Sequence, residues 1–270
     1  MKYNKYIVNL HPIFSENATI LAQRLNIEIV NEYDPKENDL IIIFGVHEKA
    51  LEILSHQLTN NFKYGLVIIA SEQMNSKAYE NKYYIELLRR NVVFPFSFSV
   101  AKDLKEKYEI ESHSIYFFDF YHIEDTIPFE ERPIDFFFAG METEYRKEQL
   151  ELLKKANPDA VFEIDFNYSY QVPIDMMKKL KDVKYVINIP YYKESSLETH
   201  RINRAISAGC KCISLRPSRK YEETGYQDYV NFVDSFENIK TIKPLKDWND
   251  LMEKIGKSVI SHNVEKILSI

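Results

Sequence analysis

Residues 191–201 combine side chains that could hold a phosphorylated ligand. The apolar run Val183–Ile189 is typical of a buried parallel strand, and the spacing of apolar residues predicts a helix from Leu197. The first backbone N–H groups of such a helix, together with its dipole, favour an anion at this point. Arg201 could add a bidentate contact to a phosphate, and Glu198 could accept hydrogen bonds from a ribose diol. An ordinary strand–helix–strand unit with a solvated helix end is the competing interpretation.

A second candidate phosphate contact follows the apolar run Ile134–Ala139, which predicts another buried strand. Gly140 comes directly after this strand, and glycine would let the backbone approach a phosphate closely. Arg146 stands near the start of the next helix and could supply the countercharge. Lys147 is more simply explained as a solvated side chain, whereas for Arg146 both interpretations stay open.

Candidate proton acceptors follow two predicted strands in the first half of the chain. His47 comes after the strand Asp39–Phe44, and Glu72 comes after the strand Tyr64–Ala70. Either side chain could take a proton from a hydroxyl group, either could be structural, and a retaining reaction could need no protein base. Other polar side chains at predicted strand ends are His11 and Ser97.

The elements that must position these residues alternate between strand and helix, which predicts an α/β fold with parallel, doubly wound sheets. The polar stretch Ile123–Pro133 is typical of a linker, so we predict two domains, 1–131 and 132–270. Ligands bind to such sheets outside the carboxyl ends of the strands, where the candidate residues lie. Further predicted elements include a strand at Ser114–Phe118 and helices at Pro173–Leu180, Trp248–Ile255 and Ser258–Ile270.

Composition narrows the class of protein. A length of 270 residues fits two ordinary domains, and 45% hydrophobic residues are enough for globular cores. The net charge of −6 argues against a nucleic-acid partner, which needs concentrated positive charge. Only two cysteines occur, which suits a reducing compartment. The chain shows neither a signal peptide nor an apolar run of membrane-spanning length, so we expect a cytoplasmic protein without a transmembrane segment.

Several common catalytic motifs are missing from the sequence. It contains no HExxH, GxxxxGK[ST], GxSxG or GxGxxG pattern, which disfavours zinc hydrolases, P-loop kinases, esterases and common dinucleotide enzymes. The DxD pattern of metal-dependent sugar transfer is absent as well. We therefore expect an activity that needs neither a metal ion nor a cofactor.

The polar segment and the helix after it resemble the donor-binding signature of glycosyltransferases with the GT-B fold. The similarity is to short members that carry N-x-x-Y-Y, then E-T-x-R-I, then A-x-G in their C-terminal half. The matching residues are Tyr191-Tyr192, Glu198, Arg201-Ile202, Ala205-Ile206 and Ala208-Gly209. Gly140 and Arg146 are similar to the family's G-x-x-x-x-R/K pattern, and SEQM and VVFPFSFS loosely fit its N-terminal half. The loop Asn9–Glu16 departs from the family because it lacks glycine.

This resemblance implies two Rossmann-like domains that face a cleft, with the nucleotide held by the second. Glu198 would bind the ribose, Thr199 and Arg201 would lie near the diphosphate, and Tyr191 would belong to the same donor site. The implied reaction moves a sugar from a UDP- or GDP-sugar donor to a hydroxyl group of a glycan or another acceptor. A non-catalytic nucleotide- or sugar-binding module and a UDP-sugar epimerase of the same fold are the alternatives.

Overall fold

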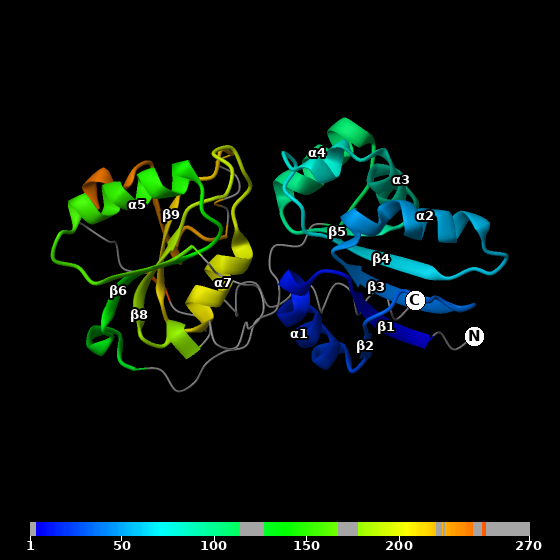
Figure 1. Cartoon of the computed structure of the whole chain (residues 1–270), viewed down its shortest axis with the longest axis horizontal. Helices are drawn as coiled ribbons and strands as arrows, with labels where there is room; N and C mark the ends of the chain where they lie inside the picture. The colour runs from blue at the N-terminus through cyan, green and yellow to red at the C-terminus, as the bar shows by residue number, and fades with distance from the viewer. Residues whose placement is uncertain are drawn as a thin grey trace. The chain divides into compact units, whose positions relative to one another are not determined.

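The computed structural model describes residues 4–113, 127–166, 178–219, 223, 225–239 and 245–246. These residues form two compact units, one containing residues 4–113 and the other containing the described residues from 127 onward. Each unit has a parallel five-stranded sheet flanked by helices (Figure 1). This architecture confirms the predicted α/β class with two Rossmann-like, doubly wound sheets. The domain limits 1–131 and 132–270 stay a prediction.

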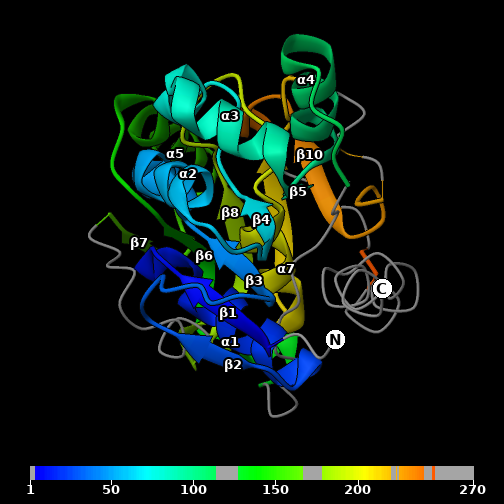
Figure 2. The same cartoon turned by 90° about the vertical axis from the view of Figure 1, so that its right-hand side faces the viewer.

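The first unit contains β1 (Asn4–Asn9), α1 (Ser15–Leu25), β2 (Glu28–Val30), β3 (Asp39–Phe44), α2 (Ala50–Thr59), β4 (Gly65–Ala70), α3 (Lys82–Arg90), β5 (Val92–Pro95) and α4 (Phe98–Tyr108). Its strand order is β2-β1-β3-β4-β5, which can be followed across the sheet in Figure 2. The central strand β3 has four fully buried residues at positions 41–44. Its unbroken apolar run is what a strand covered on both faces requires.

The second unit contains β6 (Ile134–Ala139), α5 (Glu144–Ala156), β7 (Phe162–Asp165), β8 (Val183–Asn188), α7 (Thr199–Ser207), β9 (Lys211–Leu215) and β10 (Val230–Val233). Its strand order is β10-β9-β8-β6-β7, with every neighbouring pair parallel. In both units the first strand lies between the second and the third. Each sheet therefore has a topological switch point, between β1 and β3 and between β6 and β8, and such points are where ligands bind in this class of fold.

Two separate apolar cores hold the helices of the second unit to its sheet. Phe136 and Phe138 of β6 pack with Leu150 of α5, whereas the intervening Phe137 packs with Ala205 of α7. Alternate residues of a strand point to opposite faces of a sheet, so α5 and α7 cover opposite faces. This packing fixes the start of both helices at the carboxyl ends of β6 and β8.

The segment before β6 is held more firmly than a polar linker would be. Arg132 is buried, and it donates hydrogen bonds to the carbonyl oxygens of Ile127 at 3.0 Å, Val183 at 2.7 Å and Ala208 at 3.2 Å. The hydrogen bonds of Arg132 therefore connect this segment to β8 and to the C-terminal end of α7. The linker prediction missed this contact because its partners are backbone groups far away in the sequence.

Several predicted elements fall outside the described residues. These are the strand Ser114–Phe118, most of the helix Pro173–Leu180, and the helices Trp248–Ile255 and Ser258–Ile270. Within the part of the chain that the structure describes, no helix combines the length and apolar character needed to cross a membrane.

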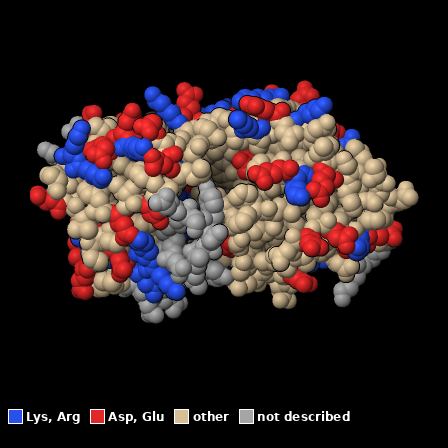
Figure 3. Space-filling model, viewed as in Figure 1, with Lys and Arg blue, Asp and Glu red and all other residues tan. Residues whose placement is uncertain are grey.

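The surface mixes acidic and basic side chains on the face shown in Figure 3. Many of these form exposed ion pairs, such as Arg90 Nε with Glu86 Oε1 at 2.6 Å on α3. Exposed pairs of this kind contribute little to stability, because water screens both charges. The charged groups that need a separate explanation are the buried ones in the second unit.

Candidate functional site

The segment with the candidate phosphate contacts folds as strand, loop, helix and strand, as its sequence predicts. Three apolar residues of α7, Ile202, Ala205 and Ile206, are buried. Gly209 has a φ of 71°, and the N–H of Cys210 donates to the carbonyl of Ala205 at 2.9 Å. Glycine thus ends the helix in the left-handed conformation that most other residues avoid.

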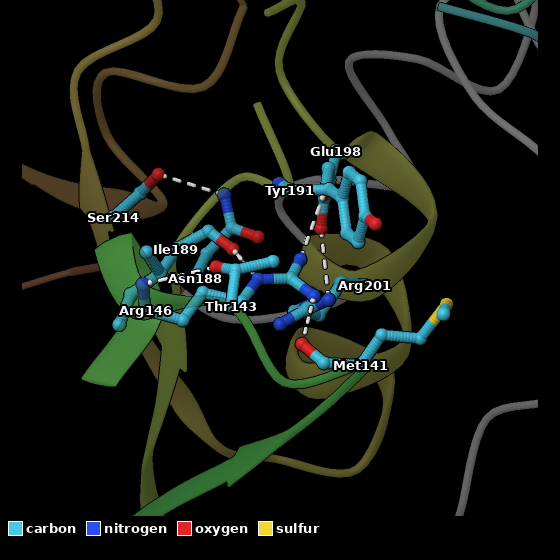
Figure 4. Close-up of polar contacts among 9 residues, drawn as sticks. All are labelled: Met141, Thr143, Arg146, Asn188, Ile189, Tyr191, Glu198, Arg201 and Ser214. Atoms are coloured by element: carbon cyan, nitrogen blue, oxygen red, sulfur yellow. Dashed lines mark hydrogen bonds and ion pairs between the residues drawn. The ribbon is translucent and has the colours of Figure 1, made fainter. Parts of the chain in front are cut away.

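A buried carboxylate joins two arginines at the start of α7 (Figure 4). Arg146 Nη2 lies 3.4 Å from Glu198 Oε1, and Arg201 Nη2 lies 2.8 Å from Glu198 Oε2. The backbone N–H of Tyr191 also donates to Oε1, at 3.1 Å. The side chain of Glu198 is 9% exposed and that of Arg201 is 16% exposed. Most of the residues that the sequence proposed for donor binding are therefore in one cluster; that they bind a donor stays a prediction.

Gly140 makes room for this cluster at the carboxyl end of β6. A Cβ atom at this position would lie 3.0 Å from Arg146 Nη1 and 3.3 Å from Arg201 Nη2. Both distances are tighter than ordinary van der Waals contact. The glycine therefore admits two guanidinium groups beside the backbone, which is a further reason for glycine besides the predicted approach of a phosphate.

Aromatic rings line the same cluster. The guanidinium carbon of Arg146 lies 5.3 Å from the centre of the Phe138 ring and 5.4 Å from that of Tyr191. Arg201 lies 5.1 Å from the Phe138 ring. The aromatic faces favour the positive charges and help to keep them ordered while little water reaches them. Tyr191 is 38% exposed, so its ring is available at the surface of the cluster.

The electrostatic balance of the cluster is positive. Burial raises the pKa of Glu198, but the charges of Arg201 and Arg146 outweigh burial and lower its pKa overall, so the carboxylate is ionised. Burial lowers the pKa of His200 to about 4; the charge of Glu198 opposes this shift and the charges of Arg201 and Arg204 add to it, so the ring is neutral at pH 7. Two arginines and one carboxylate give these three side chains together a net charge of one positive unit, which favours an anion beside them.

Besides Glu198 Oε2, which is ion-paired with Arg201, five buried polar atoms around the start of α7 have no hydrogen-bond partner among the described residues. Buried polar groups are almost always paired in proteins, so such a group of atoms indicates a place that can accept a polar ligand or water. Arg201 keeps a free donor in Nη1, and Thr199 keeps a free hydroxyl. The five atoms are Asn188 Oδ1, Ser195 Oγ, Thr199 Oγ1, Arg201 Nη1 and Asn203 Nδ2.

The first unit brings together the two candidate proton acceptors that the sequence left as alternatives. His47 Nδ1 lies 3.2 Å from Glu72 Oε1, within ion-pair distance but without the geometry of a hydrogen bond. Both side chains are 22% exposed, and they follow the neighbouring strands β3 and β4. Gly45 has a φ of 68°, and a Cβ there would lie 2.6 Å from the Cβ of His11. Glycine thus allows the loops after β1 and β3 to meet beside His47.

The other polar residues at strand ends of this unit have local roles. Ser97 caps α4, because its hydroxyl accepts a hydrogen bond from the N–H of Val100 at 3.2 Å. His11 Nδ1 accepts from the N–H of Ile13 at 3.3 Å, and its ring centre lies 6.5 Å from that of His47. Lys147 in the second unit pairs with Glu142 and Glu144, in line with the prediction that it is solvated.

Sequence analysis did not single out two of the residues with unpaired buried atoms, Asn188 and Asn203. Asn188 donates to the Ser214 hydroxyl at 2.9 Å, and Asn203 accepts from the Tyr226 hydroxyl at 2.7 Å. A polar residue four positions after Thr199 on the same helix was a usable signal for Asn203. An asparagine within an apolar strand was the corresponding signal for Asn188. Across the described ranges, no three His, Cys, Asp or Glu side chains are grouped so that they could hold a metal ion.

Comparison with known proteins finds similarity in structure but not in sequence. No family model matches the chain, and no curated protein matches it. The structure of Anabaena Alr3699/HepE in complex with UDP and glucose aligns with a TM-score of 0.56 at 11% identity, over 99% of this chain and 95% of that one.

Two other solved structures align over similar lengths. The UDP-GlcNAc 2-epimerase from Methanocaldococcus jannaschii gives a TM-score of 0.46 at 11% identity, over 98% and 99% of the two chains. An alpha-glucosyltransferase in complex with UDP-glucose and DNA containing an abasic site gives 0.49 at 10% identity, over 95% and 90%. The chain thus shares with HepE the fold of two Rossmann-like domains, whereas the GT-B donor signature of residues 191–209 stays a prediction.

Proposed function

We propose that the protein is a glycosyltransferase that moves a sugar from a nucleotide-sugar donor to a hydroxyl group of a glycan or another acceptor. The observation that carries this proposal is the cluster of Arg146, Glu198 and Arg201 at the start of α7, whose three side chains together carry a net positive charge. The cluster lies at the topological switch point of the second sheet, where nucleotides bind in related folds. The likeness of the fold to HepE supports the same choice, and its ligand makes UDP the first probe to test.

In this proposal the donor binds through its phosphates and its ribose. The diphosphate lies at the start of α7, where the helix dipole, the Thr199 hydroxyl and the free Nη1 of Arg201 favour negative charge. Glu198 accepts a hydrogen bond from the ribose, because its carboxylate oxygens can accept more hydrogen bonds than their present partners supply. The ring of Tyr191 packs against the donor at the exposed side of the cluster.

The chemistry requires a stabilised leaving group and an activated acceptor. Arg201 and the helix amides stabilise the charge that develops on the departing diphosphate, so we propose an activity that needs no metal ion or cofactor. His47 accepts the proton of the acceptor hydroxyl through Nε2. Glu72 Oε1, 3.2 Å from Nδ1, and Glu48 Oε1, 3.9 Å from Nε2, favour the positive charge that the imidazole gains when it accepts the proton.

Product analysis tests the proposal. The protein is incubated with UDP- and GDP-sugars and a panel of hydroxyl acceptors, with and without excess chelator. Release of the nucleotide diphosphate together with a glycosylated acceptor, undiminished by chelator, is the expected result. Conversion of a UDP-sugar to its epimer without nucleotide release would instead establish an epimerase, and binding without turnover would establish a binding module. Loss of activity with chelator would contradict the metal-independent mechanism.

A further inference from the structure

Arg146 and Arg201 contact the same carboxylate but differ in how much hydrogen-bonding capacity they have left. Arg146 donates through Nε to the carbonyl of Ile189 at 3.1 Å and through Nη1 to the carbonyl of Met141 at 2.9 Å. Its Nη2 faces Glu198 at 3.4 Å. All three nitrogens of this guanidinium group are therefore engaged by the protein itself.

The partners of Arg146 come from three separate segments of the second unit. Met141 follows β6, Ile189 follows β8, and Glu198 directly precedes α7. The Arg146 side chain is 3% exposed, and the missing side chain of Gly140 leaves the space that Nη1 occupies. A planar group with fixed donor directions is suited to joining three backbone segments in one geometry.

Arg201 makes fewer contacts with the protein than Arg146 does. Among the described residues it has one ion pair, with Glu198, and its buried Nη1 has no partner, while the side chain as a whole keeps 16% exposure. An incoming anion can gain a hydrogen bond from Nη1 of Arg201, whereas Arg146 is 3% exposed and directs each of its nitrogens at a protein acceptor, so it offers an anion far less access.

We infer that Arg146 is a positioning residue, which fixes Glu198 and the loops that follow β6 and β8. Of the two arginines, only Arg201 contacts the phosphates. This inference rests on the proposed donor site. It assigns different parts of one ligand to the two arginines: Arg146 governs ribose recognition through Glu198, and Arg201 governs phosphate recognition directly.

The test compares the affinities for UDP, uridine and pyrophosphate of the wild type, Arg146→Lys and Arg201→Lys. Titration calorimetry is used for UDP and pyrophosphate, and ligand-observed NMR for uridine. Lysine keeps the positive charge but lacks the several fixed hydrogen-bond donors of a guanidinium group. Arg146→Lys should therefore lower the affinities for uridine and for UDP by the same factor, about tenfold. Arg201→Lys should weaken UDP and pyrophosphate by about tenfold while uridine stays within about twofold. Lys147→Gln, an exposed change on the same helix, is the matched control and should alter none of the affinities.

The opposite pattern would overturn the inference: loss of UDP and pyrophosphate binding in folded Arg146→Lys, with uridine binding unchanged, would make Arg146 a phosphate ligand. A wild type that binds none of the three probes would contradict the proposed function instead. In that case a ligand-free double-mutant cycle decides the inference, with urea unfolding of Arg146→Lys, Glu198→Gln and the double variant. Positioning predicts strongly non-additive effects, and additive effects would refute it.

Discussion

The two units share one strand topology but carry different chemistry at the carboxyl ends of their strands. Beside β6 and β8, the second unit has two arginines and a glutamate that are largely buried, and the arginines lower the pKa of the glutamate. Beside β3 and β4, the first unit has a histidine and a glutamate that keep 22% exposure each. Fixed, desolvated charges suit the binding of an anion, whereas an accessible imidazole suits proton transfer. One topology thus supplies both a candidate binding site and a candidate base, according to which side chains follow the strands.

The largest expected effect is on the candidate base of the first unit. His47→Gln should lower the transfer rate by about 10²–10⁴, because glutamine has a similar shape but cannot take a proton at neutral pH. Glu72→Gln should lower it by a smaller factor, since the imidazole remains and only its orientation and charge support are lost. Initial rates at saturating donor measure both variants. If the His47→Gln variant is as fast as the wild type, His47 is not the general base.

The buried glutamate should dominate the stability of the second unit. Glu198→Ala leaves two arginines largely buried without their countercharge, and removing one partner of a buried pair costs about 3 kcal/mol or more in the free energy of unfolding. Pyrophosphate should restore more stability to this variant than it adds to the wild type, because it supplies the missing negative charge. Urea unfolding with and without pyrophosphate measures both effects.

The matched control for that change is Glu151→Ala on α5, whose carboxylate pairs with Lys154 at 2.9 Å and is 58% exposed. This variant should unfold nearly as the wild type does, because exposed pairs contribute little. Equal stabilities of the Glu198 and Glu151 variants would show that the buried cluster has no special role.

A methyl group at Gly140 should disturb binding more than folding. In Gly140→Ala the new Cβ would lie 3.0 Å from Arg146 Nη1 and 3.3 Å from Arg201 Nη2, so the guanidinium groups must shift. We expect the affinity for UDP to fall by about tenfold, the value of one hydrogen bond to a charged group. Titration calorimetry measures the change. Unchanged UDP affinity in this variant would show that the two arginines do not contribute to UDP binding.

The smallest expected effect is a pH dependence that comes from His200. Burial and the nearby arginines lower its pKa in the folded protein below the ordinary 6.5, so the unfolded chain takes up the proton first as the pH falls. The neutral ring therefore contributes stability above pH 6.5, and this contribution is lost on acidification. The unfolding free energy of the wild type, relative to His200→Gln, should fall by on the order of 1 kcal/mol between pH 7 and pH 5. A difference that does not vary with pH would contradict this assignment.

The sequence predicted elements better than it predicted contacts between them. The strand at 39–44 and the helix of the second switch point were predictable, because continuous apolar runs and helical spacing reflect burial directly. The pairing of His47 with Glu72 was not, because it depends on β3 and β4 being neighbours in the sheet. The contacts of Arg132 and Arg146 could not be predicted for a similar reason: most of their partners are backbone carbonyl groups, which leave no trace in the pattern of side chains.

The most direct test of the account is the titration of UDP into the wild type, Arg201→Gln and His47→Gln. The account places the nucleotide at the start of α7 in the second unit and the proton acceptor in the first. UDP affinity should therefore fall by about tenfold or more in Arg201→Gln and stay within about twofold in His47→Gln. Wild-type affinity in Arg201→Gln, or lost binding in His47→Gln alone, would contradict it.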